Sequence, residues 1–347
     1  MPKARIVTAV PLSREQLDRL GEWEVTFVDF AQAGRAEIEA ALADAEGLLV
    51  DSRALVDENL IECAPGLRAI STISVGFDHL AVAAAVERGI TVTITPVLSD
   101  AVADLTLALI VMVERRLGEA ITDMTRGVWN DARLGTDVRA KTLLIVGFGR
   151  IGREVAQRAL AFKMRVSAFD TRRNLPEMEG VERVATLADG LERADVVSLH
   201  VDLNPSTHHL IDAAAIARMK PTAIVINTSR GGVVDQTALT RALAEGRLAG
   251  AGLDVLEVEP PEAGEPLLAM ANVVVLPHIG SATTETRNAM RDCAIANLTA
   301  CLRGESCAHA LLPEAVFSAP ARKDDGVQTG SARARTVGEQ RPVRRRS

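Results

Sequence analysis

The stretch KTLLIVGFGRIGREVAQRAL, residues 141–160, constrains the fold more than any other part of the chain. A run of aliphatic residues typical of a buried strand ends at a glycine, and a helical pattern begins soon afterwards. Gly147, Gly149 and Gly152 form the spacing G-x-G-x-x-G at this turn. In a strand–turn–helix context the glycines permit a tight turn, close approach of a pyrophosphate and close helix packing. The stretch predicts a dinucleotide-binding loop, although a turn without a ligand would also need small residues.

One carboxylate and two arginines follow the next predicted strand. Asp170 ends the segment RVSAFD, eighteen residues beyond Gly152, which is about where a carboxylate binds the ribose hydroxyls of a dinucleotide. Such a carboxylate would repel a 2′-phosphate, whereas Arg172 and Arg173 would accommodate one. Because like-charge repulsion should outweigh solvated arginines, we expect NAD to be favoured and NADP to be possible.

Strands and helices alternate along most of the chain, which predicts an α/β fold with doubly wound, mostly parallel sheets. The expected strands are 4–10, 46–51, 67–73, 90–94, 141–146, 165–169, 195–200, 222–227, 248–255 and 272–276. The expected helices are 13–21, 78–89, 283–303 and one long helix over 99–127 that is interrupted near Gly118. Ser13 and Gln16 have the spacing of a capping box at the first of these helices. The six strands after residue 140 match the number in a complete dinucleotide-binding sheet.

Composition excludes several classes of function. The net charge of −7 gives no general attraction to nucleic acid or anionic membranes, and with 3% aromatic residues a base-stacking surface is not expected. The longest strongly apolar run, Leu105–Val113, is about half the length of a membrane span, and the N-terminus lacks a secretory pattern. The four cysteines have no metal-ligand spacing, so we predict reduced thiols in a cytoplasmic protein and no metal site. The polar tail, residues 313–347, is expected to be disordered.

Three segments beyond the glycine loop each end a predicted strand with a reactive side chain. NTSRGGVVD presents Arg230, GLDVLEVEPP presents Glu259, and VVVLPHIGS presents His278. A planar cation can bind a carboxylate and polarise a carbonyl, and a histidine can protonate a developing alkoxide. A carboxylate beside that histidine would orient the ring and favour its charged form. Each residue alone could be a surface charge or a capping group, but together they indicate hydride transfer to a 2-keto acid.

The motifs STISVGFDHLAV, GFGRIG, NTSRGGVVD, GLDVLEVEPP and LPHIGSAT occur in this order over about residues 4–312. On these motifs the chain resembles the D-isomer-specific 2-hydroxyacid dehydrogenase family, and in particular its glyoxylate/hydroxypyruvate reductases. The resemblance implies that Arg230, Glu259 and His278 are catalytic and that the backbone of Val75 and Gly76 binds the substrate carboxylate. It also implies that Asp254 contacts the nicotinamide amide. The full set of expected cofactor contacts is Gly147, Gly149, Arg150, Ile151, Gly152, Asp170, Arg172, Arg173, Leu203, Thr228, Asp254, His278 and Gly280.

The same resemblance implies two similar α/β domains, with a Rossmann domain that binds NAD(P) inserted into a flavodoxin-like substrate domain. We expect the substrate domain over 1–98 and 284–312 and the NAD(P)-binding domain over 99–283. A homodimer that forms through the cofactor domain is implied as well. The chain departs from the family pattern at Leu144, Asp104 and Asp202. Oxidation of a D-2-hydroxyacid such as 3-phosphoglycerate, or a non-catalytic role as a cofactor-sensing corepressor, are the alternatives to a reductase of small 2-keto acids.

Overall fold

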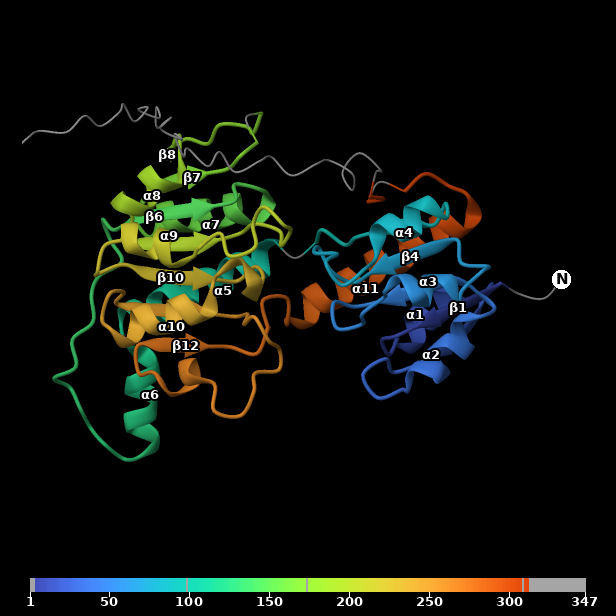
Figure 1. Ribbon diagram of the computed structural model, residues 1–347, viewed down its shortest axis with the longest axis horizontal. Helices are drawn as coiled ribbons and strands as arrows, with labels where there is room; N and C mark the ends of the chain where they lie inside the picture. Colours follow the sequence, from blue (N-terminus) through green and yellow to red (C-terminus); the bar gives the residue numbers. More distant parts are fainter. Residues whose placement is uncertain (1–3, 98, 173, 308, 312–347) are drawn as a thin grey trace, which may run out of the picture.

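The computed structural model describes residues 4–97, 99–172, 174–307 and 309–311. Arg173 and the tail predicted to be disordered lie outside the described residues. Figure 1 shows two lobes, one built around strands β1–β5 and the other around strands β6–β12. The fold class predicted from the sequence, two α/β domains with parallel sheets, is therefore confirmed.

The smaller lobe contains a five-stranded parallel sheet within the described residues, in the order β2-β1-β3-β4-β5. Its strands are β1 (Arg5–Thr8), β2 (Glu24–Phe27), β3 (Ala45–Val50), β4 (Ala69–Thr72) and β5 (Thr91–Thr93). Its helices are α1 (Arg14–Arg19), α2 (Arg35–Leu42), α3 (Glu58–Glu62), α4 (Val82–Glu87) and α11 (Thr284–Arg303). Strand order reverses beside β1, and the carboxyl ends of the strands there face the other lobe. This is where open parallel sheets place ligands.

The larger lobe contains a seven-stranded parallel sheet within the described residues, in the order β12-β11-β10-β9-β6-β7-β8. Its strands are β6 (Thr142–Val146), β7 (Arg165–Phe169), β8 (Val181–Arg183), β9 (Val196–Leu199), β10 (Ile224–Asn227), β11 (Gly250–Leu253) and β12 (Val273–Val275). Its helices are α5 (Ser99–Glu114), α6 (Leu117–Thr125), α7 (Arg150–Ala161), α8 (Leu187–Arg193), α9 (Ala213–Arg218) and α10 (Gln236–Ala244). The strand order reverses between β6 and β9, so the glycine loop that follows β6 lies at the switch point of the sheet.

Two helices connect the lobes. Helix α5 packs on α7 and β11 of the larger lobe, while α11, at the other end of that lobe in sequence, packs on β3 and β4 of the smaller lobe. The chain therefore leaves the smaller lobe once and returns to it (Figure 1). This path is the one expected for an inserted domain, and the domain bounds themselves stay a prediction.

Aliphatic side chains form the core of both lobes. In the larger lobe Leu144, Val197 and Val225 are fully buried between the sheet and helices α8 to α10, and Leu48 and Ile70 are buried in the smaller lobe. Each such side chain contributes roughly 1.5–3 kcal/mol when it leaves water, so aliphatic packing compensates for the scarcity of aromatic residues. In the described ranges, no helix has the length and apolar character that crossing a membrane requires.

All ten predicted strands are present, and the capping box of Ser13 and Gln16 is confirmed. Two strands, β2 and β8, were not predicted, because both are short edge strands whose residues are exposed or half-buried. The break predicted near Gly118 in the helical stretch 99–127 is confirmed. Helix α5 ends at Glu114, and Arg116 in the left-handed region (φ 53°) caps helix α6, which begins at Leu117. Helix α4 is shorter than the predicted 78–89, because a turn occupies residues 78–80.

Candidate active site

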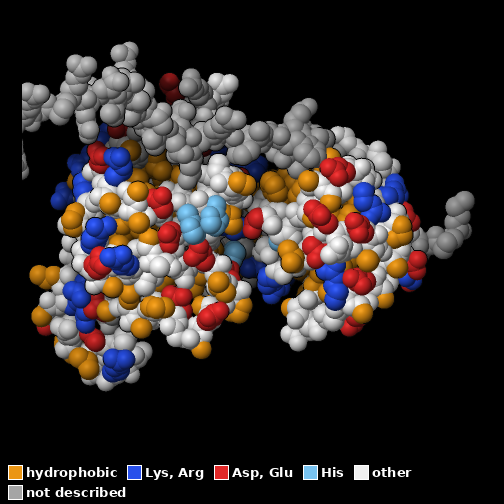
Figure 2. Space-filling view, viewed as in Figure 1, with side chains coloured by type: hydrophobic (Ala, Val, Ile, Leu, Met, Phe, Trp, Pro, Cys, Tyr) orange, Lys and Arg blue, Asp and Glu red, His pale blue; other side chains and the backbone are white. Residues whose placement is uncertain are grey.

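A cleft of about 1060 Å³ lies between the two lobes, at the carboxyl ends of both sheets. Figure 2 shows a furrow between the lobes, with histidine side chains beside it. Ten of the predicted site residues line this cleft: Val75, Gly76, Ile151, Leu203, Thr228, Arg230, Asp254, Glu259, His278 and Gly280. The chain therefore brings together residues that are more than 200 positions apart in the sequence.

His278 and Glu259 form a hydrogen-bonded pair in the cleft. The distance from Nδ1 of His278 to Oε2 of Glu259 is 2.7 Å. The other oxygen of Glu259 accepts the backbone N–H of Leu256 at 3.0 Å, which fixes the carboxylate. The backbone of His278 is in the left-handed region (φ 54°), and its N–H donates to the carbonyl of Asp254 at 2.9 Å. Nε2 of His278 has no hydrogen-bond partner among the described residues, so it is the nitrogen left to meet a ligand.

The environment of Glu259 keeps it ionised. Burial alone would raise the pKa of this carboxyl, but the hydrogen bond and charge of His278 and the N–H of Leu256 outweigh burial, so the pKa is lowered. The positive charge of Arg230 acts in the same direction. An ionised Glu259 accepts the hydrogen bond from Nδ1–H of the histidine and so orients the imidazole ring.

Arg230 reaches across the cleft to the smaller lobe. It follows β10, and its Nε donates to Oδ1 of Asp78 at 2.9 Å while Nη1 donates to the carbonyl of Ser229 at 3.0 Å. Nη2 lies against Gly76, where a Cβ atom would overlap the guanidinium. The structure therefore places Arg230 beside the backbone segment that was expected to bind a substrate carboxylate. Asp78 was not predicted as a site residue, although it lies two positions after Gly76 in a segment that the motifs had singled out.

The glycine loop has the shape that a dinucleotide requires. Gly147 has a positive φ of 95°, and a Cβ atom on it would overlap the carbonyl of His200. A Cβ atom on Gly152 would overlap the carbonyl of Gly147, so only glycine lets α7 start this close to β6. Small residues at these positions keep the N-terminus of α7 accessible, and the loop fits a bound pyrophosphate. Arg150 is exposed at the start of α7 and does not line the cleft.

Asp170 is tied both to this loop and to Arg172. Its carboxylate accepts the backbone N–H of Phe148 at 2.8 Å and three hydrogen bonds from Arg172, one from the backbone and two from the guanidinium. Burial opposes ionisation, but these hydrogen bonds prevail and lower the pKa of Asp170. Arg172 also lies close to Gly149, where a Cβ atom would be 3.3 Å from Nη2. Asp170, the carboxylate that is expected to bind the adenosine ribose, is therefore already paired with the guanidinium of Arg172.

Asp254 organises the turn that carries His278. Its two carboxylate oxygens accept the backbone N–H groups of Ile279 at 2.8 Å and Gly280 at 2.7 Å. Its burial raises its pKa, and these two hydrogen bonds oppose that effect. Gly280 is needed here because a Cβ atom would be only 3.1 Å from Oδ2 of Asp254. The contact predicted between Asp254 and a nicotinamide would therefore use the remaining lone pairs of a carboxylate that already has a structural function.

Sequence reasoning missed two further residues of the cleft. His200, which follows β9, is half-buried and bonds Ser198 through Nε2 at 2.8 Å, while its Nδ1 is buried without a hydrogen-bond partner among the described residues. Burial lowers the pKa of His200 to about 3, so it is neutral. Arg287, at the start of α11, lines the cleft, and its burial lowers its pKa. His200 stands in no motif, and only its position at a strand exit could have indicated it. Arg287 lies in the stretch HIGSATTETRNAM, which resembles the reductases, but it was not singled out there.

A glycine loop that faces a histidine–carboxylate pair and an arginine is typical of NAD(P)-dependent oxidoreductases. Residues 107–280 match the family described as D-isomer specific 2-hydroxyacid dehydrogenase, NAD binding domain, and the chain belongs to this family. It is 45% identical over 313 residues to glyoxylate/hydroxypyruvate reductase B of Citrobacter koseri, covering 87% of this chain and 96% of that protein. It is 43% identical over 283 residues to the glyoxylate reductase of Thermofilum pendens, covering 78% of this chain and 82% of that one. The crystal structure of an NADPH-dependent glyoxylate/hydroxypyruvate reductase from Sinorhizobium meliloti superposes with a TM-score of 0.79 at 31% identity, covering 92% and 100% of the two chains.

Proposed function

We propose that this protein uses NAD(P)H to reduce a small 2-keto acid of the glyoxylate or hydroxypyruvate type to the D-2-hydroxyacid. The observation that supports this most directly is the pair of His278 and Glu259, 2.7 Å apart, in a cleft that Arg230 also lines. The names of the relatives, glyoxylate reductase and glyoxylate/hydroxypyruvate reductase B, support the same class of substrate.

The reaction assigns one task to each of these side chains. Arg230 binds the carboxylate and carbonyl oxygens of the keto acid through the guanidinium edge that lies against Gly76. The backbone N–H groups of Val75 and Gly76 bind the same carboxylate from the other lobe. Bound NAD(P)H supplies the hydride. His278 donates a proton from Nε2 to the alkoxide that develops at the carbonyl oxygen, and Glu259 stabilises the imidazolium before this transfer.

For the cofactor, we propose that NADH is favoured and that NADPH is also used. Asp170 stands where the ribose hydroxyls of NADH would bind, and its negative charge disfavours a 2′-phosphate. Arg172 neutralises part of this charge through its hydrogen bonds to the same carboxylate. The two cofactors should therefore differ in KM by much less than they would beside an unpaired carboxylate.

We also propose a cytoplasmic homodimer. Helix α5, which carries the apolar run Leu105–Val113, has Leu107, Leu109 and Ile110 buried in the core of the larger lobe, so core packing explains that run. The segment between α6 and β6 instead exposes Trp129 and Leu134, at 80% and 81%. Exposed apolar side chains of this size are typical of surfaces that bind a partner chain. Light scattering on the purified protein gives the mass that tests for a dimer.

The activity is tested with steady-state rates for NADH and NADPH against glyoxylate, hydroxypyruvate, pyruvate and larger 2-keto acids, with each D-2-hydroxyacid product assayed in the reverse direction. We expect glyoxylate or hydroxypyruvate to give the highest kcat/KM. If no 2-keto acid is reduced by a protein that binds NADH, the proposal fails and a cofactor-sensing protein becomes the better description. If 3-phosphoglycerate oxidation exceeds every reduction, the direction and substrate proposed here are wrong.

A further inference from the structure

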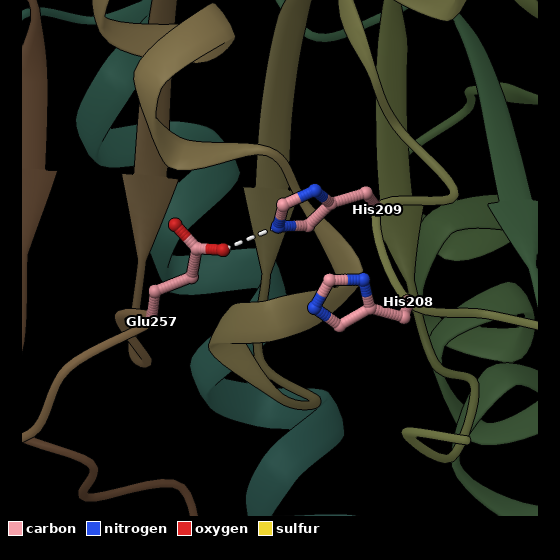
Figure 3. A group of neighbouring side chains, drawn as sticks. All are labelled: His208, His209 and Glu257. Carbon is pink, nitrogen blue, oxygen red and sulfur yellow. Dashed lines mark hydrogen bonds and ion pairs between the residues drawn. The ribbon is translucent and has the colours of Figure 1, made fainter. Parts of the chain in front are cut away.

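A second cluster of polar side chains lies at the rim of the cleft, apart from the residues assigned to catalysis. His208 and His209 lie in the loop between β9 and α9, and Glu257 lies in the segment that follows β11. Figure 3 shows the three side chains gathered together, with the ring of His209 directed at the carboxylate. One ligand atom from each residue lies within 4.8 Å of the other two. Nε2 of His209 is hydrogen-bonded to Oε1 of Glu257.

The two imidazole rings are stacked. Their centroids are 3.9 Å apart and their planes differ by 23°, which keeps both rings next to Glu257. Neutral imidazole is the form that binds a metal ion. Two imidazole nitrogens and a carboxylate oxygen form a donor set that suits Zn²⁺ and other late first-row divalent ions.

The backbone holds the two segments in place while the side chains keep some freedom. His209 is in the left-handed region (φ 50°), an uncommon conformation for a non-glycine residue, and its N–H donates to the carbonyl of Gly232 at 2.8 Å. The N–H of Glu257 donates to the side chain of Gln236 at 2.9 Å. His208 and Glu257 are exposed. They can therefore rotate to the distance of roughly 2.0–2.2 Å that zinc ligands adopt, and solvent completes the coordination.

We propose that His208, His209 and Glu257 form a binding site for a divalent transition-metal ion, with Zn²⁺ as the representative. The ion would join the loop after β9 to the segment after β11. Glu259 lies in that same segment, two residues beyond Glu257. A bound ion would therefore restrict the motion of the backbone that positions the catalytic carboxylate. Metal binding at this site requires no substrate and is independent of the proposed reductase activity.

The test is calorimetric titration of Zn²⁺ into the untagged full-length protein after treatment with a chelator. We expect one ion per chain. His209→Asn removes a ligand and keeps the backbone, because asparagine tolerates the left-handed region. Glu257→Gln removes the anionic ligand and keeps its size. Each change should weaken Zn²⁺ binding by at least about tenfold, the lower end of the loss seen even for residues that only support a metal ligand. His309→Gln, which removes a histidine distant in sequence, should leave the affinity unchanged.

Two further measurements make the result decisive. Zn²⁺ should raise the Tm of the unaltered protein and of His309→Gln, but not of His209→Asn, because only a bound ion stabilises the folded state by mass action. His278→Asn should bind Zn²⁺ as the unaltered protein does. Absence of Zn²⁺ binding, or equal affinity in His209→Asn, Glu257→Gln and the unaltered protein, would overturn the proposal. Loss of binding in His278→Asn alone would overturn it as well, since the ion would then occupy the catalytic pair.

Discussion

The wall of the cleft formed by the seven-stranded sheet presents side chains that hydrogen bonds already orient, whereas the opposite wall presents the backbone of Val75 and Gly76 together with charged side chains such as Asp78. On the first wall Glu259 is fixed by Leu256 and His278 is fixed by Glu259 and Asp254. On the second wall Asp78 accepts the ion pair that Arg230 forms across the cleft. This difference suggests that chemistry is preorganised on one wall, while the other wall positions the substrate.

The largest effect should come from the preorganised wall. His278→Asn removes the proton donor, and asparagine suits the left-handed backbone at this position (φ 54°). We expect kcat for keto acid reduction to fall by roughly 10²–10⁴-fold, the usual contribution of a general acid. Binding of NADH, measured by its fluorescence, serves as the control and should stay near normal. Unchanged turnover would show that His278 is not the proton donor.

Each lobe also contains a histidine with a lowered pKa, and these residues predict how stability depends on pH. Burial lowers the pKa of His79 in the smaller lobe to about 4, and its Nε2 is bonded to the hydroxyl of Thr72 at 2.9 Å. Below the ordinary value of 6.5 the unfolded chain takes up a proton that folded His79 does not. Stability should therefore be fully present above that value and fall as the pH drops toward 4, by up to about 3 kcal/mol.

This prediction is checked by urea unfolding at about pH 7.5 and about pH 4.5, followed through the fluorescence of Trp23, which is buried in the smaller lobe. His79→Gln cannot be protonated and keeps a polar group near Thr72. It should lose less stability between the two pH values than the unaltered protein does, by about 2–3 kcal/mol. An equal loss in both proteins would mean that protonation of His79 does not set the pH dependence of stability in the smaller lobe. His200 in the larger lobe would then be the group to change next.

How much the sequence could predict also differs between the two walls. Glycine spacing and reactive residues at strand exits depend on local pattern, so the loop at Gly147 and the residues Arg230, Glu259 and His278 could be proposed before the structure. The ion pair between Asp78 and Arg230 joins positions 152 apart and depends on how the lobes meet, which no local pattern records. Edge strands such as β8 were missed for a related reason, since their stability comes from one neighbouring strand and not from their own residues. The cluster of His208, His209 and Glu257 could not be predicted either, because it forms only where two loops meet.

A smaller effect is expected from Asp78→Asn on the second wall. The change keeps the size of the side chain but removes the charge that holds Nε of Arg230 at 2.9 Å. If Asp78 positions the guanidinium for the substrate, KM for the keto acid should rise by about tenfold, or roughly 1.4 kcal/mol, while kcat changes less. Steady-state kinetics at saturating NADH give both constants. Equal losses in kcat and kcat/KM would mean that Asp78 stabilises the transition state and does not position the bound substrate.

The smallest effect should appear in the larger lobe outside the cleft wall, at the adenosine end of the proposed cofactor site. Asp170→Ser removes the carboxylate that Arg172 binds and releases that guanidinium. A free arginine attracts a 2′-phosphate, and the carboxylate no longer repels it, so the ratio of kcat/KM for NADPH to that for NADH should rise by about fivefold, or roughly 1 kcal/mol. Asp170→Ser combined with Arg172→Ala is the matched control, because it removes the carboxylate without leaving the cation. If both variants gain equally for NADPH, repulsion by Asp170 alone sets the preference. If only the single variant gains, Arg172 is the residue that accepts the phosphate.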